Sequence, residues 1–216
     1  MTGQTRKRNI DPARRAEIGR ERRARTRSRI LAVTFDLFGR ENGLYTRVEE
    51  VCEAAGVARQ TFYNHFTGMD DLRDALAYEV SHDFLVAVTT ALDTLPNAAC
   101  RTAAAIRYYL GRGRADPQWA WSIVNLSASG FVFGAETFAQ ARKTVAEGIE
   151  TKSFNLNDDR IGRNMVMGTA LSSLFTQLRE ETPETYPADV ARAVLAGLGC
   201  APGHARQCAE MPLPHL

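Results

Sequence analysis

The sequence of 216 residues lacks the segments that mark membrane and secreted proteins. No stretch approaches the roughly 18–20 unbroken apolar residues of a membrane span. The first 30 residues have no apolar core of a secretory signal peptide. They are rich in arginine, as transit peptides are, but they hold few hydroxyl residues and form no clear amphipathic stripe. We therefore expect a cytoplasmic protein with no membrane partner.

Cysteine is scarce, and its spacing matches no common metal or redox motif. Free thiols are the expectation for a reducing cytosol. Cys200, His204 and Cys208 are four residues apart, a spacing that would align them on a helix as a soft-metal or redox site. Pro202 and Gly203 lie between them and argue against a regular helix. A frayed C-terminus is therefore predicted. The four cysteines are Cys52, Cys100, Cys200 and Cys208.

Common enzyme motifs are also missing. The chain contains no P-loop, no GxGxxG, no HExxH and no GxSxG. The adjacent acids Asp158-Asp159 and Glu180-Glu181 cannot share a helix face, so they do not form an acid/base pair. We expect no enzyme, with no catalytic residue, no metal site and no cofactor.

Charge is unevenly distributed along the chain. The total is only +2, but residues 1–30 carry eleven basic and three acidic groups, a net charge of +8. The remaining residues carry 16 basic and 22 acidic groups, a net charge of −6. A basic arm on an acidic body indicates contact with a polyanion, either nucleic acid or an anionic membrane.

Helical periodicity dominates, which predicts an all-α fold. Pro12 suits the first position of a helix, so the basic arm, residues 1–25, is either disordered or helical from residue 12. A helix from about residue 26 should end at Asn42-Gly43, because both residues tolerate a left-handed backbone. Later helices are predicted over 70–91, 99–113, 117–127, 130–149, 158–181 and 186–199.

Two short helices joined by a turn at Gly56 predict a helix-turn-helix motif. The first follows a capping box made by Thr46 and Glu49. The second spans 59–65 and would enter the major groove of DNA. An exposed polar helix between two core helices is the alternative interpretation.

Side chains of the second helix suit DNA. Arg59 can pair with guanine, Gln60 with adenine, and Thr61 can contact a thymine methyl group or a phosphate. Donors suited to phosphate oxygens follow at Tyr63, Asn64 and His65.

The run AGVxxxTFYxHF at residues 55–66 resembles the DNA-binding domain of TetR-family transcriptional repressors, and the resemblance extends over 26–75. It implies a three-helix head at 26–75 followed by a helical ligand-binding and dimerisation domain at 76–216. It also implies phosphate contacts at the start of the first short helix, and base readers and backbone contacts in the second. The implied DNA-binding residues are Thr46, Arg47, Arg59, Gln60, Thr61, Tyr63, Asn64 and His65.

The sequence departs from the family pattern at two places that bear on DNA. Ala58 stands where the family usually has serine, which removes a side-chain cap from the recognition helix at a cost of about 1 kcal/mol. Met69 stands where a phosphate-binding lysine is usual. Residues 31–75 have a net charge of −4, so the positive charge lies almost wholly in the arm. We expect the arm to replace the lost phosphate contact.

The regulatory domain should hold a ligand pocket and a dimer interface. Core packing within the monomer is the alternative for every residue of both sets. The predicted interface, a bundle of helices from two subunits, consists of Ile161, Gly168, Leu171, Phe175, Leu178, Val190, Val194 and Leu198. The cluster of Tyr108 and Tyr109 followed by Trp119 and Trp121 is the strongest part of the predicted pocket. The full set of pocket candidates is Phe84, Tyr108, Tyr109, Trp119, Trp121, Asn125, Phe131, Phe133, Phe138, Asn164, Met165 and Phe175.

The expected function is that of a sequence-specific transcriptional regulator. It would be a homodimeric repressor that a small hydrophobic or aromatic ligand releases from a palindromic operator in double-stranded DNA. The alternative is a DNA-binding dimer without a small-molecule effector, controlled by a protein partner. An internal cavity would favour the first and a filled core the second. A third possibility is a protein that binds membranes through its basic arm. Its binding to vesicles would survive the substitution Arg59→Ala.

Overall fold

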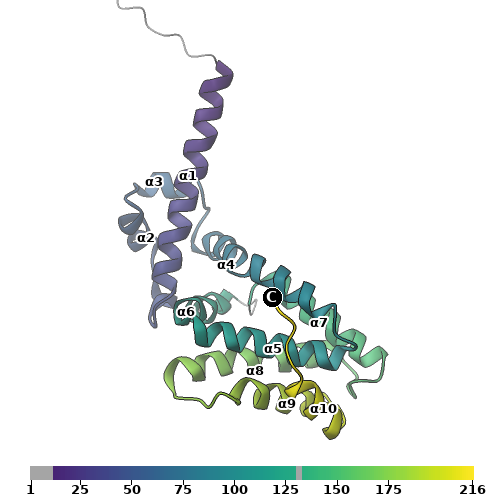
Figure 1. Ribbon diagram of the computed structural model, residues 1–216. Coiled ribbons are helices and arrows are strands. Elements are labelled where there is room, and N and C mark those ends of the chain that lie inside the picture. The colour runs from purple at the N-terminus through teal and green to yellow at the C-terminus, as the bar shows by residue number, and fades with distance from the viewer. Residues whose placement is uncertain (1–11, 130–132) are drawn as a thin grey trace, which may run out of the picture.

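A computed structural model describes residues 12–129 and 133–216, and within these ranges the chain is helical with no strand (Figure 1). This confirms the predicted all-α class. No helix in the described part is long and apolar enough to span a bilayer. The elements are α1 (Pro12–Phe38), η1 (Gly43–Tyr45), α2 (Val48–Ala55), α3 (Arg59–Tyr63), α4 (Met69–Leu92), α5 (Ala98–Ala115), α6 (Pro117–Leu126), η2 (Ser127–Ser129), α7 (Ala135–Glu150), α8 (Asp159–Arg179), α9 (Tyr186–Gly197) and α10 (Pro202–Glu210).

The head consists of α1, α2, α3 and the first turns of α4, packed around a small apolar core. Phe62 of α3 and Phe66 after it are buried against Phe38 of α1 and Leu72 of α4. Helices as short as α2 and α3 are not stable alone, so this shared core holds them in place. The two phenylalanines thus anchor the recognition helix to the head core.

Residues 12–25 of the basic arm are the N-terminal part of α1, which runs without a break to Phe38. Figure 1 shows this part of α1 projecting away from the rest of the molecule. The side chains of residues 13–25 are exposed, since most of them are polar or charged. Of the two alternatives for the arm, a helix from residue 12 is therefore correct. The rest of the arm, residues 1–11, lies outside the described residues.

The capping box of α2 is one residue later than predicted. Thr46 ends η1, where its backbone N–H donates to the carbonyl oxygen of Gly43 at 3.1 Å. Arg47 is therefore the N-cap, and its backbone N–H donates to a carboxylate oxygen of Glu50 at 2.8 Å. The prediction for Thr46 and Glu49 was wrong because the preceding turn already uses Thr46.

The regulatory domain is built around α5, which contacts α6, α7, α8, α9 and α10. Leu110 of α5, Leu174 of α8 and Leu195 of α9 are fully buried in its core. The predicted helix at 130–149 begins later, at Ala135, because Phe133 and Gly134 have positive φ angles of 60° and 85°.

The C-terminus forms a helix, α10, and is not frayed as predicted. Pro202 occupies the first helical turn, where a missing N–H costs nothing, so it starts the helix instead of breaking it. Cys208 of α10 forms a disulfide with Cys100 of α5, a pairing that the expectation of free thiols did not include. Cys52 and Cys200 are free and buried.

Head and regulatory domain meet where α6 packs against the end of α1. Asn125 donates from Nδ2 to the carbonyl oxygens of Phe38 and Arg40, both at 2.8 Å. A Cβ atom at Gly43 would stand 2.8 Å from that same nitrogen, so glycine is needed beside it. Gln118 adds an exposed hydrogen bond to Asp36 at 2.9 Å. The joint thus depends on an asparagine that the sequence analysis assigned to the ligand pocket.

Candidate DNA-binding surface and effector cavity

The helix-turn-helix consists of α2, a tight turn and α3. Gly56 ends α2 in the left-handed conformation at φ 61°, which glycine adopts without strain. Ala58 is the N-cap of α3 and makes no side-chain capping bond, as the sequence predicted. Phe62 points into the head core, so the opposite face of α3 is turned to solvent.

The predicted base-reading residues lie together on α3. Arg59 and Gln60 are exposed and Thr61 is half-buried. Arg59 forms an ion pair with Glu49 of α2 at 2.7 Å. A hydrogen bond with Tyr63, followed by the Glu49 charge, raises the pKa of Arg59, so the guanidinium stays charged. A contact between Arg59 and a base would therefore compete with the carboxylate of Glu49.

The predicted phosphate-contacting residues differ in their access to solvent. Arg47, Tyr63 and Asn64 are exposed, and His65 is half-buried. Thr46 is buried, because it closes the turn before α2. The structure therefore leaves Arg47, and not Thr46, as the accessible group at the start of α2.

The base of the arm is fixed to the end of the recognition helix. Arg23 donates from Nη2 to the carbonyl oxygen of Asn64 at 2.9 Å. The guanidinium carbon of Arg27 lies 5.1 Å from the centre of the Phe66 ring. Burial, and then the charges of Arg23 and Arg27, lower the pKa of His65 below its usual range. The sequence analysis did not foresee these contacts, since they join residues about 40 positions apart.

A cavity of about 60 Å³ lies in the regulatory domain between α4, α5, α7 and α8. By the same measure one water needs roughly 10–15 Å³, so the space holds several waters or a small molecule. Its walls are almost wholly apolar, as is usual for a ligand site. Val88 of α4, Ile106 of α5 and Val166 of α8 are among them.

The few polar groups of the cavity come from α4, α5 and α7. Tyr109 and Thr137 are joined through their hydroxyl oxygens at 3.2 Å. Burial raises the pKa of Tyr109 to about 12, so it stays a neutral phenol that can donate or accept a hydrogen bond. Arg101 is paired with Glu147 and also donates to the carbonyl oxygen of Leu95 at 3.1 Å. Its charge is already satisfied within the protein.

Of the predicted pocket candidates, Tyr109 and Phe133 line this cavity. Trp119 is buried one layer behind, its ring centre 6.1 Å from that of Tyr109. Tyr108 faces the other side of α5 and donates to the carbonyl oxygen of Pro214. Trp121 and Phe175 pack on each other outside the cavity, 6.0 Å between ring centres.

The remaining candidates also need correction. Asn125 belongs to the joint with the head. Met165 packs on α9, where its methyl carbon lies 2.5 Å from the position that a Cβ on Gly197 would take. Phe131 lies outside the described residues. Several cavity residues of α5 and α7 were not predicted, although their helical spacing was a signal that could have found them. They are Thr102, Ala105, Thr137, Gln140, Ala141 and Thr144.

The predicted dimer residues fall into two groups. On α8, Ile161 is 55% exposed and Phe175 is 40% exposed, with Gly168 open to solvent between them. Leu171 and Leu178 of α8 are half-buried. On α9, by contrast, the predicted residues are buried within the monomer because α9 uses its apolar stripe against α5 and α8. These buried residues are Val190, Val194 and Leu198.

Solved structures show the same fold. RolR in complex with resorcinol superimposes with a TM-score of 0.73 at 23% identity, covering 90% of this chain and 98% of that one. FadR from Bacillus subtilis in complex with stearoyl-CoA gives a TM-score of 0.60 at 20% identity, covering 79% and 96%. The ketosteroid transcriptional regulator KstR2 of Mycobacterium tuberculosis gives a TM-score of 0.51 at 18% identity, covering 80% of this chain and 94% of that one. A comparison with curated protein sequences finds no match.

Two family models match the chain. Residues 30–76 match the bacterial regulatory proteins of the tetR family, which cover the helix-turn-helix. Residues 97–211 match the tetracyclin repressor-like C-terminal domain, which covers α5 to α10 and so includes the disulfide and the cavity helices α5, α7 and α8. This second match spans more than half of the chain, so the protein belongs to the TetR family of transcriptional regulators.

Proposed function

We propose that this TetR-family regulator is a homodimeric repressor that binds a palindromic operator and is released from it by a small hydrophobic or aromatic molecule. The observation that carries the proposal is the course of α4. Leu72 and Leu76, near its start, are buried in the head core, whereas Leu85, Val88 and Leu92 line the cavity. One continuous helix therefore connects the proposed ligand site to the DNA-binding head.

A second connection runs through α5 and α6. The cavity-lining helix α5 is followed at once by α6, because Asp116 both ends the first and caps the second. Asn125, in the last turns of α6, holds the end of α1. A ligand that changes the preferred position of α4 or α5 would change the orientation of the head. The shift cannot exceed the difference between the ligand's affinities for the two states.

The cavity supports a small aromatic effector that carries a hydroxyl group. Its volume excludes a large ligand unless the walls move, and its only buried hydroxyl pair is that of Tyr109 and Thr137 among the described cavity residues. No free charge faces it in this part of the chain, since Arg101 is paired with Glu147. RolR, which has the same fold, is solved in complex with resorcinol, so resorcinol is a suitable first probe of this size class.

We propose that the dimer forms through α8 and the exposed side of α9. Ile161, Gly168 and Phe175 provide the α8 surface. On α9 we assign the exposed Ala193 and Ala196 to the interface, in place of the predicted residues Val190, Val194 and Leu198, which are buried within the monomer. A two-fold dimer would place two recognition helices for a palindrome with half-sites one groove turn, or a multiple of it, apart.

The experiment is selection of bound DNA from a random pool with the full-length protein. The selected site is then challenged with a panel of small hydrophobic and aromatic compounds that includes resorcinol. The proposal expects a palindromic site and at least one compound that dissociates it. A palindrome that no compound affects would favour control by a protein partner, and vesicle binding retained by Arg59→Ala, without a selected site, would contradict the DNA-binding proposal.

A further inference from the structure

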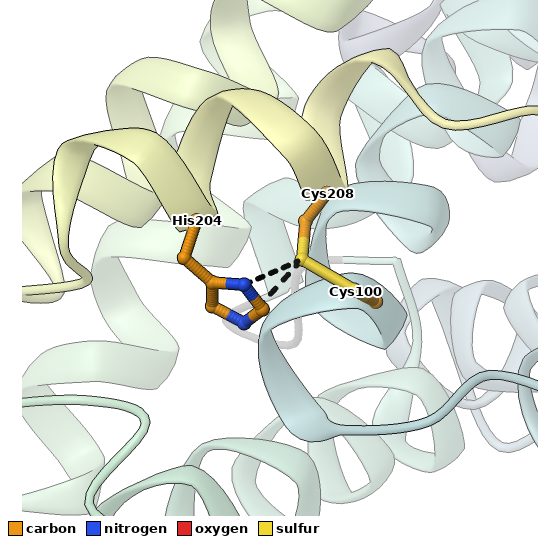
Figure 2. Close-up of side chains that lie close together, drawn as sticks. All are labelled: Cys100, His204 and Cys208. Carbon is orange, nitrogen blue, oxygen red and sulfur yellow. Dashed lines mark hydrogen bonds between the residues drawn. A yellow bond between two sulfur atoms is a disulfide. The ribbon is translucent and has the colours of Figure 1, made fainter.

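The disulfide between Cys100 and Cys208 has a histidine beside it. Figure 2 shows the ring of His204 next to Cys208, on the same helix and one turn earlier. The Sγ atom of Cys208 lies 3.6 Å from Nε2 and 3.9 Å from Nδ1 of this ring. Neither the proposed DNA surface nor the cavity wall uses these three side chains.

The surroundings of these cysteines differ from those of the other two. Cys100 is in the first turn of α5, where the helix dipole favours a thiolate. Cys208 has an imidazole as a nearby proton acceptor, and His204 is only half-buried, so it forms the polar approach to the sulfur pair. Burial instead raises the pKa of the thiols of Cys52 and Cys200. All four sulfurs are buried, so what distinguishes Cys100 and Cys208 is their contact with each other, the helix N-terminus at Cys100 and the imidazole beside Cys208.

We propose that Cys100 and Cys208 are a reversible redox-modification site, which peroxide closes as a disulfide and small thiol reductants open. The proposal rests on the proposed function in one respect. A DNA-binding regulator works in a reducing compartment, where protein disulfides are usually transient, catalytic or redox-sensing.

The chemistry is balanced with hydrogen peroxide as the oxidant. His204 accepts the thiol proton of Cys208, and the thiolate attacks one peroxide oxygen. The O–O bond breaks, and the leaving oxygen takes the proton from His204 and departs as water. The thiolate of Cys100 then attacks the sulfenic sulfur of Cys208, the S–S bond forms, and hydroxide leaves and is protonated by the thiol proton of Cys100. Two thiols are oxidised by two electrons while peroxide is reduced to two waters.

The bond would control how firmly α10 and the C-terminal tail are held on α5. Beyond Cys208 the tail contacts α5 through Arg107, which donates to the carbonyl oxygen of Met211 at 2.6 Å, and through Tyr108, which donates to that of Pro214. Arg101 and Thr102, next to Cys100, line the cavity. Reduction therefore releases one of the restraints on the helix that forms the cavity wall.

Thiol counting on the full-length protein tests the modification directly. The protein is reduced, freed of reductant, treated with hydrogen peroxide and then alkylated under denaturing conditions. We expect the alkylatable thiols to fall from four to two, with Cys100 and Cys208 joined in the peptide map. Cys200→Ala is the matched control and should still lose two thiols, whereas Cys208→Ala should form no disulfide. His204→Gln should reach the same end point more slowly.

Hydrogen exchange of the same samples tests the structural consequence. We expect reduction to cause loss of amide protection in α10 and the first turn of α5, and peroxide to restore it. Three results would overturn the proposal: a disulfide that native protein keeps in excess reductant, oxidation that spares Cys100 and Cys208, or equimolar zinc binding by the reduced protein that Cys208→Ala abolishes. None of these measurements depends on DNA or effector, so their failure is distinct from failure of the proposed function.

Discussion

Asn125 of α6 donates a hydrogen bond to the carbonyl oxygen of Phe38 at 2.8 Å and so joins the regulatory domain to the last residue of α1. Both residues are buried. The same nitrogen also satisfies the carbonyl oxygen of Arg40. This one side chain therefore binds two backbone carbonyl groups where the head meets the regulatory domain. It connects α6 to the helix that carries the basic arm.

Replacing Asn125 should weaken this joint. Asn125→Ala removes the side-chain donor of the buried Phe38 carbonyl oxygen, whereas that of Arg40 keeps the N–H of Gly43, and we expect a cost of about 1–3 kcal/mol of the free energy of unfolding. Denaturant titration measures the loss. Gln118→Ala is the control, since its bond to Asp36 is exposed and its removal should cost less. An equal loss in both variants would refute the special role of Asn125.

Arg59 and Arg47 should affect DNA binding differently. Arg59→Ala should lower affinity for the selected site by about 1–3 kcal/mol and relax the preference at one base pair. Arg47→Ala should weaken binding to all sequences alike and lower the salt slope by about 0.9, as expected for one phosphate contact. Affinity measurements on the selected site and on single-base variants, across salt concentrations, separate the two. Similar profiles for both variants would contradict the assignment.

The arm should supply sequence-independent affinity. Arg14 and Arg20 are exposed on the projecting part of α1. If each contacts a phosphate, the double variant Arg14→Gln/Arg20→Gln should lower the slope of log affinity against log salt by about 1.8. Arg192→Gln/Arg206→Gln removes two exposed arginines from α9 and α10 and should leave the slope unchanged. An unchanged slope in the arm variant would show that the arm does not contact DNA.

His65 should make stability depend on pH. Burial and the charges of Arg23 and Arg27 lower its pKa in the folded protein, so the unfolded chain, with a pKa of about 6.5, binds the proton more readily. The His65 contribution to stability is then fully present above pH 6.5 and is lost as pH falls from that value through the lower pKa of the folded protein. Denaturant titrations between pH 7.5 and 5 should therefore show a smaller loss for His65→Gln. The control is His215→Gln at the exposed C-terminus, and an identical pH dependence in wild type and His65→Gln would count against this assignment.

Local sequence patterns predicted the head well because its structure is determined by neighbouring residues. Gly56 at the turn and the polar second helix with Arg59 follow from short-range rules of helix formation, and the phenylalanines at 62 and 66 belong to the motif that carries the family resemblance. The one-residue error at Thr46 arose because two turns compete for the same residue.

The regulatory domain was harder to predict, because its functional features join distant segments. Cys100 and Cys208 are 108 residues apart, and no local pattern indicates their pairing. Aromatic content pointed to Trp119 and Trp121, whereas most of the cavity wall is made of aliphatic and small side chains of α4, α5, α7 and α8. Asn125 resembled a pocket residue until its backbone partners were known. Pro202 was interpreted as a helix breaker when it is a helix start.

The central claim is that the cavity and the DNA-binding head are coupled, and the most direct test is the affinity of an active compound for the free and the DNA-bound protein. Linkage requires that the compound weakens DNA binding by the same factor by which DNA weakens binding of the compound. We predict a lower affinity for the DNA-bound form, and loss of compound binding when Ala141→Phe fills the cavity. Equal affinity for the two forms would contradict the account, since such a compound cannot release DNA.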